Sequence, residues 1–335
     1  MIHKEKLIRR CLSVLLCMMV MLLAVPTTIA QAQPVVRSSA ASLSPTLSVS
    51  SQLNQRRYVA AGDRAYELGS EDGRYPAMGF HTRGEMGGIW SPPIKLLDGI
   101  WFGINGHWIG PATNFTSGFG YVQMALPTTD GVQVTRTDFA PDGRRAVEFG
   151  LTLTAPRSTE FHLNVDAHSE LMSAYPWGFT TPNQLQFNLP DSATFNGHQL
   201  VFRDVGTPPV PNAPHHDWAA IVGATGLTPI FGTTGSAFRG PQDPPVICPA
   251  SPGPDQFRCD DTAYGKGAGG ELTYEIKLRA RAGLTVWFTV AGSDQGLIGA
   301  QTEYRAASMR PAGELQAKVA ARHVLNSQTQ VSLPA

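Results

Sequence analysis

The stretch EFHLNVDAHSELMSAYPWG, residues 160–178, alternates apolar and polar side chains over eleven residues. The polar parity holds two imidazoles, an amide and two carboxylates: His162, Asn164, Asp166, His168 and Glu170. Successive side chains of a β-strand point to opposite faces, so a strand here presents one chemically active face. Such residues can converge on a metal ion, with help from His216 and Asp217 of a distant strand. The alternative interpretation is a polar sheet surface or a docking face.

Tryptophans form a second chemical candidate. Trp90, Trp101 and Trp108 lie in a Gly- and Pro-rich region, and Trp177 and Trp218 follow later. Flat rings beside polar groups suit sugars, although the same rings also fill protein cores. We expect half of the six tryptophans to be core residues. Trp90 and Trp177, which lie beside Pro or Gly, are the better ligand candidates.

Glycoside hydrolysis would need a pair of carboxylates, one acting as acid and the other as base or nucleophile. The candidates are Glu85, Asp98, Asp166 and Glu170, and salt bridging or turn capping is the alternative for each. The sequence holds no G-x-S-x-G elbow, Rossmann glycine pattern, P-loop or H-E-x-x-H motif. It therefore indicates neither a serine nucleophile nor a cofactor.

The elements that position these residues have mainly the period of strands. The segments 146–154, 272–279 and 284–292 alternate apolar and polar residues. Turns are expected at Asn105-Gly106, Asp130-Gly131, Pro141-Asp142-Gly143 and Asn196-Gly197, because Asn-Gly and Asp-Gly accept positive φ angles. These signals predict an all-β fold, a large antiparallel β-sandwich. A closed barrel and two small sandwiches are the alternatives.

Four segments follow from the composition. Residues 1–32 have a basic start, an apolar centre and an A-x-A site, which predict a cleaved signal peptide and a secreted or periplasmic protein. An uncleaved membrane anchor is the alternative. Residues 33–56, rich in Ser, Ala and Pro, predict a flexible linker, and 57–310 the sandwich. Residues 311–335 predict a short C-terminal linker helix, at about 312–325, and a tail.

Charge and cysteines restrict the partners and the chemistry. Cleavage would remove four basic residues and one acidic residue from totals of 26 and 26, leaving 22 basic and 25 acidic residues. This charge of −3 gives no reason to expect nucleic acid or, after cleavage, a membrane as partner. Cys248 and Cys259 would remain, an even pair that predicts a disulfide in an exported protein. A metal-binding or redox pair of thiols is the alternative.

Several long strings carry a resemblance to a known family: GEMGGIWSPPIKLLDGIWFGING, FTSGFGYV, VTRTDFAPDGRRAVEFGLTL, DAHSELMSAYPWG and CDDTAYGKGAGGELTY. From about residue 58 onward, the sequence resembles the N-terminal region of secreted bacterial glycogen-debranching, or amylo-α-1,6-glucosidase-like, glycoside hydrolases. In that family a β-supersandwich is joined by a helical linker to an α/α barrel that carries the catalytic acid and base. The resemblance implies a non-catalytic supersandwich, because this chain contains no such barrel, and no catalytic residue carries over.

The resemblance also implies partners and a location for the contacts. We expect a glucan or another oligo- or polysaccharide and a catalytic α/α barrel domain, with loops of the sandwich at the rim of the substrate cleft. The candidates for that rim or for domain docking are Trp90, His168, Glu170, Tyr175 and Trp177. A stand-alone carbohydrate-binding sandwich and a metal-dependent enzyme on the strand face remain as alternatives.

Overall fold

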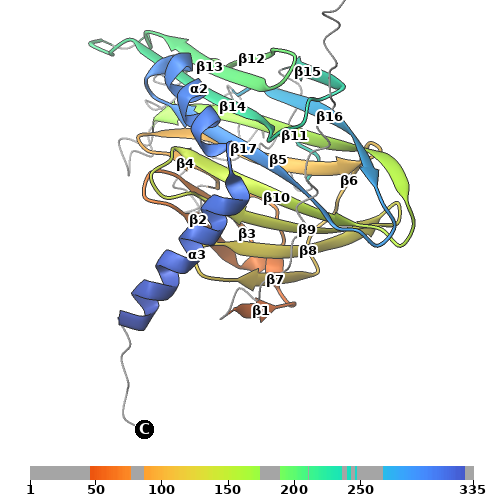
Figure 1. Ribbon diagram of the computed structural model, residues 1–335. Helices are drawn as coiled ribbons and strands as arrows, with labels where there is room; N and C mark the ends of the chain where they lie inside the picture. Colours follow the sequence, from red (N-terminus) through yellow and green to blue (C-terminus); the bar gives the residue numbers. More distant parts are fainter. Residues whose placement is uncertain are drawn as a thin grey trace, which may run out of the picture. The chain divides into compact units, whose positions relative to one another are not determined.

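The chain folds into two antiparallel sheets, as the alternating segments predict, in a computed structural model (Figure 1). The structure describes residues 46–76, 87–173, 189–209, 211–235, 240–242, 246 and 267–328. All of these belong to one compact unit, Arg37–Ala335. The fold class is therefore an all-β sandwich.

The first sheet, sheet A, has nine strands in the described residues. Its strands are, in spatial order, β1 (Leu47–Val49), β7 (Asn114–Ser117), β8 (Val122–Thr129), β9 (Val132–Phe139), β10 (Ala146–Thr154), β17 (Leu284–Ser293), β14 (His216–Ala224), β13 (Leu200–Gly206) and β12 (Ser192–Phe195).

The second sheet, sheet B, has eight strands in the same part of the chain. Its path is β15 (Phe231–Gly235), β16 (Gly269–Leu278), β11 (Thr159–Ser173), β5 (Ile94–Ile104), β4 (Gly88–Ser91), β3 (Tyr66–Ser70) and β2 (Arg57–Ala61), and β6 (His107–Trp108) pairs with β5. Strand β11, which carries the polar parity, lies centrally between β16 and β5.

The core lies between the sheets and is formed by the apolar residues of the alternating segments, as expected. Val147, Phe149 and Leu151 of β10 are fully buried. Phe102 of β5 reaches across from sheet B, and its ring lies 6.2 Å from that of Phe149 and 5.4 Å from that of Phe288. Packing of this kind removes both inner faces from water and stabilises the sandwich.

The turn predictions are confirmed at the hairpins. Asn105 and Gly106 have φ angles of 51° and 77°, and Asp130 and Gly131 have φ angles of 51° and 76°. These positive values join β5 to β6 and β8 to β9 with tight turns.

Two helices follow the last strand. The predicted helix is α3 (Pro311–Gln328). A further helix, α2 (Gly296–Ala307), replaces the final part of the expected sandwich and packs on β14 and β17 (Figure 1). Its buried residues Ala300, Tyr304 and Ala307 are three and four positions apart, a helical signal that the strand-based interpretation missed. Among the described residues, no helix combines the length and the apolar character that a membrane-spanning segment requires.

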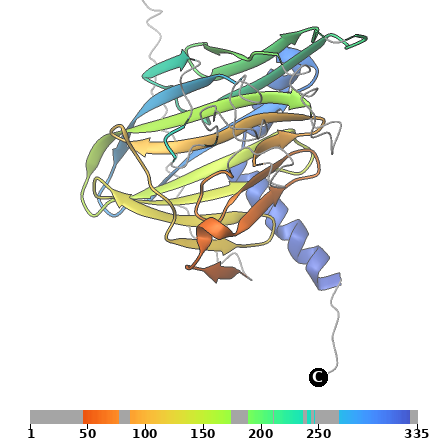
Figure 2. The ribbon, with the colours of Figure 1, turned by 180° about the vertical axis from the view of Figure 1, so that it is seen from behind.

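Ordered structure also precedes residue 57, where we expected the sandwich to begin. Strand β1 pairs with β7, and the short 3-10 helix η1 (Leu53–Gln55) follows it. Leu53 is buried against Tyr58, Phe115 and Met124. The end of the predicted linker is therefore part of the sandwich. Figure 2, the view from behind, shows η1 and strands β2 and β3 in orange beside each other.

Candidate functional site

Strand β5 has an interruption along one of its edges. Its first part pairs with β4 as far as Leu97, and its last part pairs with β6 from Gly103. Between these, residues 98–102 have no strand partner on that edge in the described chain. The turn that follows β3 and the separate segment 240–242 lie there instead, because Gln242 Oε1 accepts hydrogen bonds from Trp101 Nε1 of β5 at 3.1 Å and from Tyr75 N at 2.9 Å.

A cavity of about 270 Å³ opens at this interruption. Its apolar wall includes Trp101, Phe102 and Trp108. Its polar groups come from four side chains: Asp72, Arg74, Arg136 and Gln242. An apolar pocket with a few convergent polar groups is the usual form of a small-molecule binding site.

Two glycines of β5 make room for the tryptophan rings. A Cβ atom on Gly103 would lie 2.8 Å from Cε3 of Trp108, so this ring lies directly against the strand. A Cβ atom on Gly99 would lie 2.7 Å from Cζ2 of Trp101. The half-buried Trp108 thus has one ring face held by the sheet, while its side chain lines the cavity.

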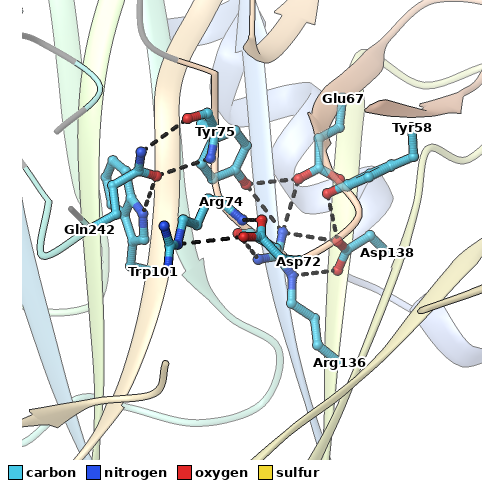
Figure 3. A network of polar contacts seen from close by, with 10 residues as sticks. Tyr58, Glu67, Asp72, Arg74, Tyr75, Trp101, Arg136, Asp138 and Gln242 are labelled. Atoms are coloured by element: carbon cyan, nitrogen blue, oxygen red, sulfur yellow. Dashed lines mark hydrogen bonds and ion pairs between the residues drawn. The ribbon is translucent and has the colours of Figure 1, made fainter. Parts of the chain in front are cut away.

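Gln242 fixes the position of Trp101 (Figure 3). Its Oε1 accepts hydrogen bonds from Trp101 Nε1 at 3.1 Å and from Tyr75 N at 2.9 Å, and its Nε2 donates to Tyr75 O at 2.9 Å. A fixed ring loses little conformational entropy when a ligand binds, which favours affinity. The amide is therefore a positioning group for the aromatic wall.

Beneath the cavity lies a buried charge network, also drawn in Figure 3. Arg136 Nε and Nη2 lie 2.9 Å from Asp138 Oδ1 and Oδ2, and Nη2 also lies 2.9 Å from Glu67 Oε1. Tyr75 donates its hydroxyl to Glu67 Oε1 at 2.7 Å, and Tyr58 donates to Asp138 Oδ2 at 3.2 Å. This network joins β3 of sheet B to β9 of sheet A.

In this network one guanidinium contacts two buried carboxyl groups, and the pKa values of both carboxyl groups are raised. Burial, followed by the charge of Asp138, raises the pKa of Glu67 to about 8 although Arg136 lowers it. Burial also raises the pKa of Asp138, against the effect of Arg136. Glu67 therefore keeps its proton to a higher pH than a free carboxyl group does, and its contact with Arg136 is then a hydrogen bond from the guanidinium to a neutral carboxyl group.

The structure places two of the predicted rim residues close together in the interior of the protein. Trp90 and His168 are buried, with 0% and 1% exposure, beside Lys95 and Asp98. His168 Nδ1 lies 2.9 Å from Asp98 Oδ2, Lys95 Nζ donates to Asp98 Oδ1 at 2.5 Å, and the Lys95 ammonium lies 5.7 Å from the centre of the Trp90 ring. Burial raises the pKa of Asp98, but Lys95 and His168 lower it more, so this carboxyl is ionised.

Glu170 is also buried, with 0% exposure. The side chains of Trp90, His168 and Glu170 thus lie inside the described part of the protein, and their role at a rim or docking surface stays a prediction. Tyr175, Trp177 and Glu85 lie outside the described residues, as do Cys248 and Cys259.

The described side chains of the strand face do not gather into the metal site that the sequence suggested as an alternative. His162, Asp166, His168 and Glu170 are all described, and the described residues hold no group of three or more ligand side chains that could bind a metal ion. His162 is exposed, whereas His168 is held by Asp98. The suggested additional ligands have other partners, since His216 Nε2 lies 2.8 Å from Asp204 and Asp217 pairs with Arg203.

Asp166 instead faces another carboxylate. It lies opposite Glu271 on β16 and opposite Trp101 on β5. Burial, and next the charge of Glu271, raise the pKa of Asp166 to about 7. Asn164 donates a hydrogen bond to Glu271 Oε1 at 2.9 Å, so the amide supplies a hydrogen-bond partner to one of the two carboxyl groups.

The sequence indicated only part of the cavity. Trp101 and Trp108 are among the aromatic residues that suited sugars, and the Asn105-Gly106 turn between them brings their strands together. Asp72, Arg74, Arg136 and Gln242 had no local signal, because they come from a turn, from β9 and from a segment far along the chain.

Comparisons with known proteins are limited to solved structures. No family model and no curated protein matches the chain. A protein assigned as a kojibiose phosphorylase, from the human microbiome, has a TM-score of 0.45 and 9% identity, over 79% of this chain and 35% of its own. A protein assigned as an aldose 1-epimerase, from Klebsiella pneumoniae subsp. pneumoniae MGH 78578, has a TM-score of 0.29 and 9% identity, over 78% of this chain and 90% of its own. This chain spans about a third of the length of the first protein.

Proposed function

We propose that this chain is a non-catalytic, carbohydrate-binding β-sandwich of the kind that accompanies glycoside hydrolases. The observation that carries the proposal is the cavity beside β5, where Trp101 and Trp108 line a space that also contains charged and amide groups. Aromatic rings stack on the C–H faces of sugars, and carboxylate and guanidinium groups bind their hydroxyls. The cavity volume of about 270 Å³ suits a sugar ring.

A neutral sugar fits the charges of the cavity better than an acidic one. Arg74 Nε lies 3.5 Å from Asp72 Oδ2, and Arg136 is paired with Asp138. Each cation of the lining therefore has its own carboxylate. A negatively charged ligand would have to compete with that carboxylate for the cation. Glucans, which the sequence resemblance implies, are neutral.

The wider setting is also part of the proposal. The resemblance implies a secreted or periplasmic enzyme in which the sandwich packs on a catalytic α/α barrel. Helix α3 supports this arrangement, because Leu315 and Val319 attach its first half to the sandwich while its second half is largely exposed. An exposed helix half provides a surface for a second domain.

Titration of the whole chain with malto- and isomalto-oligosaccharides tests the function. We expect saturable binding, by calorimetry and tryptophan fluorescence, that is lost in Trp108→Ala. Trp218→Ala is the matched control, because Trp218 is a half-buried tryptophan outside the cavity. Binding should persist in this control. A wild-type chain that binds neither series contradicts the proposal.

The absence of catalysis is tested separately. The purified chain should release no reducing sugar from glycogen or from either oligosaccharide series. Hydrolysis that disappears on a single change, such as Asp166→Asn or Glu271→Gln, would show instead that the chain is an enzyme. The exposed Glu160→Gln is the control for a nonspecific effect of removing a carboxylate.

A further inference from the structure

The cavity beside β5 is closed at its inner end. Phe102 and Arg136 form this end and are 4% and 3% exposed. The Arg136 guanidinium lies 5.5 Å from the centre of the Phe102 ring and 5.1 Å from that of Phe149, which belongs to the core. A ligand therefore cannot pass through the cavity into the space between the sheets.

The sides of the cavity are also tied together. Ala112 N donates to Asp72 O at 2.8 Å and Ile109 N donates to Phe102 O at 2.9 Å, so the segment after β6 is joined both to the turn and to β5. Arg136 Nη1 donates to Gly73 O at 3.3 Å, which ties the same turn to β9. These bonds join the turn, β5, β9 and the segment after β6 around the space.

The exposed part of the lining lies at Gly110 and Pro111, whereas the lining residues Trp101 and Asp72 are buried. A ligand that enters there meets the half-buried Trp108 before the buried groups. This order places the aromatic stacking surface near the opening and the paired charges Asp72 and Arg74 within reach of hydroxyls.

We infer that the cavity takes the terminal sugar residue of a neutral glucan and excludes internal stretches of the chain. This inference rests on the proposed function. An internal residue continues in two directions and needs an open groove, whereas a terminal residue continues in one direction and fits a cavity with a closed inner end. The volume of about 270 Å³ lies below the roughly 300–1,000 Å³ of pockets that hold drug-sized ligands, which also favours a single ring.

A linear and a cyclic oligosaccharide of the same length test the inference. Maltoheptaose and β-cyclodextrin contain the same number of α-1,4-linked glucose residues, but the cyclic molecule has no terminal residue. Calorimetric titration of the full chain should give an affinity at least about tenfold lower for β-cyclodextrin. Trp108→Ala and Asp72→Asn should reduce the affinity for maltoheptaose toward that of the cyclic ligand.

The possible results separate the two proposals. Equal affinities for both ligands, lost together in Trp108→Ala, would overturn terminal recognition and leave carbohydrate binding by the cavity intact. Binding that is unchanged in both variants would overturn both proposals. A chain that binds neither maltoheptaose nor β-cyclodextrin would also overturn both. The unfolding temperature of each variant, measured without sugar, shows whether a lost affinity reflects a misfolded chain.

Discussion

Arg136 Nη2 lies 2.9 Å from Glu67 Oε1, and this pair connects the two sheets in the interior of the sandwich. Both side chains are buried, with 3% and 0% exposure. Asp138 contacts the other side of the guanidinium, so Arg136 binds two carboxyl groups, of which Glu67 has its pKa raised to about 8. This buried network is costly to break, because the Arg136 cation would lose partners in a medium of low polarity.

The first prediction concerns the pH dependence of stability at Glu67. Burial and Asp138 raise the pKa of Glu67 from 4.5 to about 8 in the folded chain. Between these values the unfolded chain releases the proton while the folded chain keeps it, so the free energy of unfolding falls as the pH rises. Glu67→Gln cannot titrate, and urea unfolding at about pH 5 and pH 8 should show a smaller loss of stability in this variant.

The matched control for this prediction is Glu160→Gln, at an exposed position of β11. It should lose as much stability between the two pH values as the wild type. If Glu67→Gln and the wild type also have the same pH dependence, Glu67 does not keep its proton in the folded chain.

The second prediction concerns Lys95, Asp98 and His168. Asp98→Asn leaves the buried Lys95 ammonium without a counter-charge, and we expect a loss of about 3–5 kcal/mol in the free energy of unfolding. Lys95→Met added to that change removes the stranded charge and should restore part of the stability. A double-mutant cycle by urea denaturation measures the coupling, which should exceed about 1 kcal/mol. Additive effects of the two changes would mean that the ion pair contributes nothing.

The third prediction concerns the attachment of α3 to the sandwich. Lys318 Nζ lies 2.7 Å from Asp142 Oδ1, and Arg322 Nη2 lies 3.1 Å from the same oxygen. Lys318 is 3% exposed, so Asp142→Asn leaves a buried cation without its charge partner and should cost about 1–3 kcal/mol. Hydrogen exchange should accelerate in α3, at residues 311–328, and remain slow in β10. Exchange in α3 equal to that of the wild type would show that apolar packing alone holds the helix.

Local patterns predicted the parts of the fold in which neighbours along the chain decide the structure. The alternation of Val147, Phe149 and Leu151 predicted a strand with one face in the core, and the Asn105-Gly106 dipeptide predicted a hairpin. In both cases the structure depends on the period of side chains or on φ angles of adjacent residues.

Local patterns could not predict the contacts between segments that are far apart in the sequence. The partner of Trp101 and Tyr75 is Gln242, which lies far along the chain. On β11, the alternation correctly separated polar from apolar residues, but it could not show that the polar parity is buried from Asn164 onward. The bond between His168 and Asp98 depends on which strands pair and in which register, and one sequence does not specify that register.

The fourth prediction uses Gly103 to test the position of Trp108. A Cβ atom at Gly103 would lie 2.8 Å from Cε3 of Trp108, closer than atoms can approach, so Gly103→Ala should displace this ring from the strand and cost about 1–3 kcal/mol of stability. Binding of maltoheptaose should weaken several-fold. Gly283→Ala is the control, because the nearest atom to its Cβ would be Thr154 Cγ2 at 3.8 Å, an ordinary contact. Unchanged affinity in a folded Gly103→Ala chain would mean that sugar does not stack on Trp108.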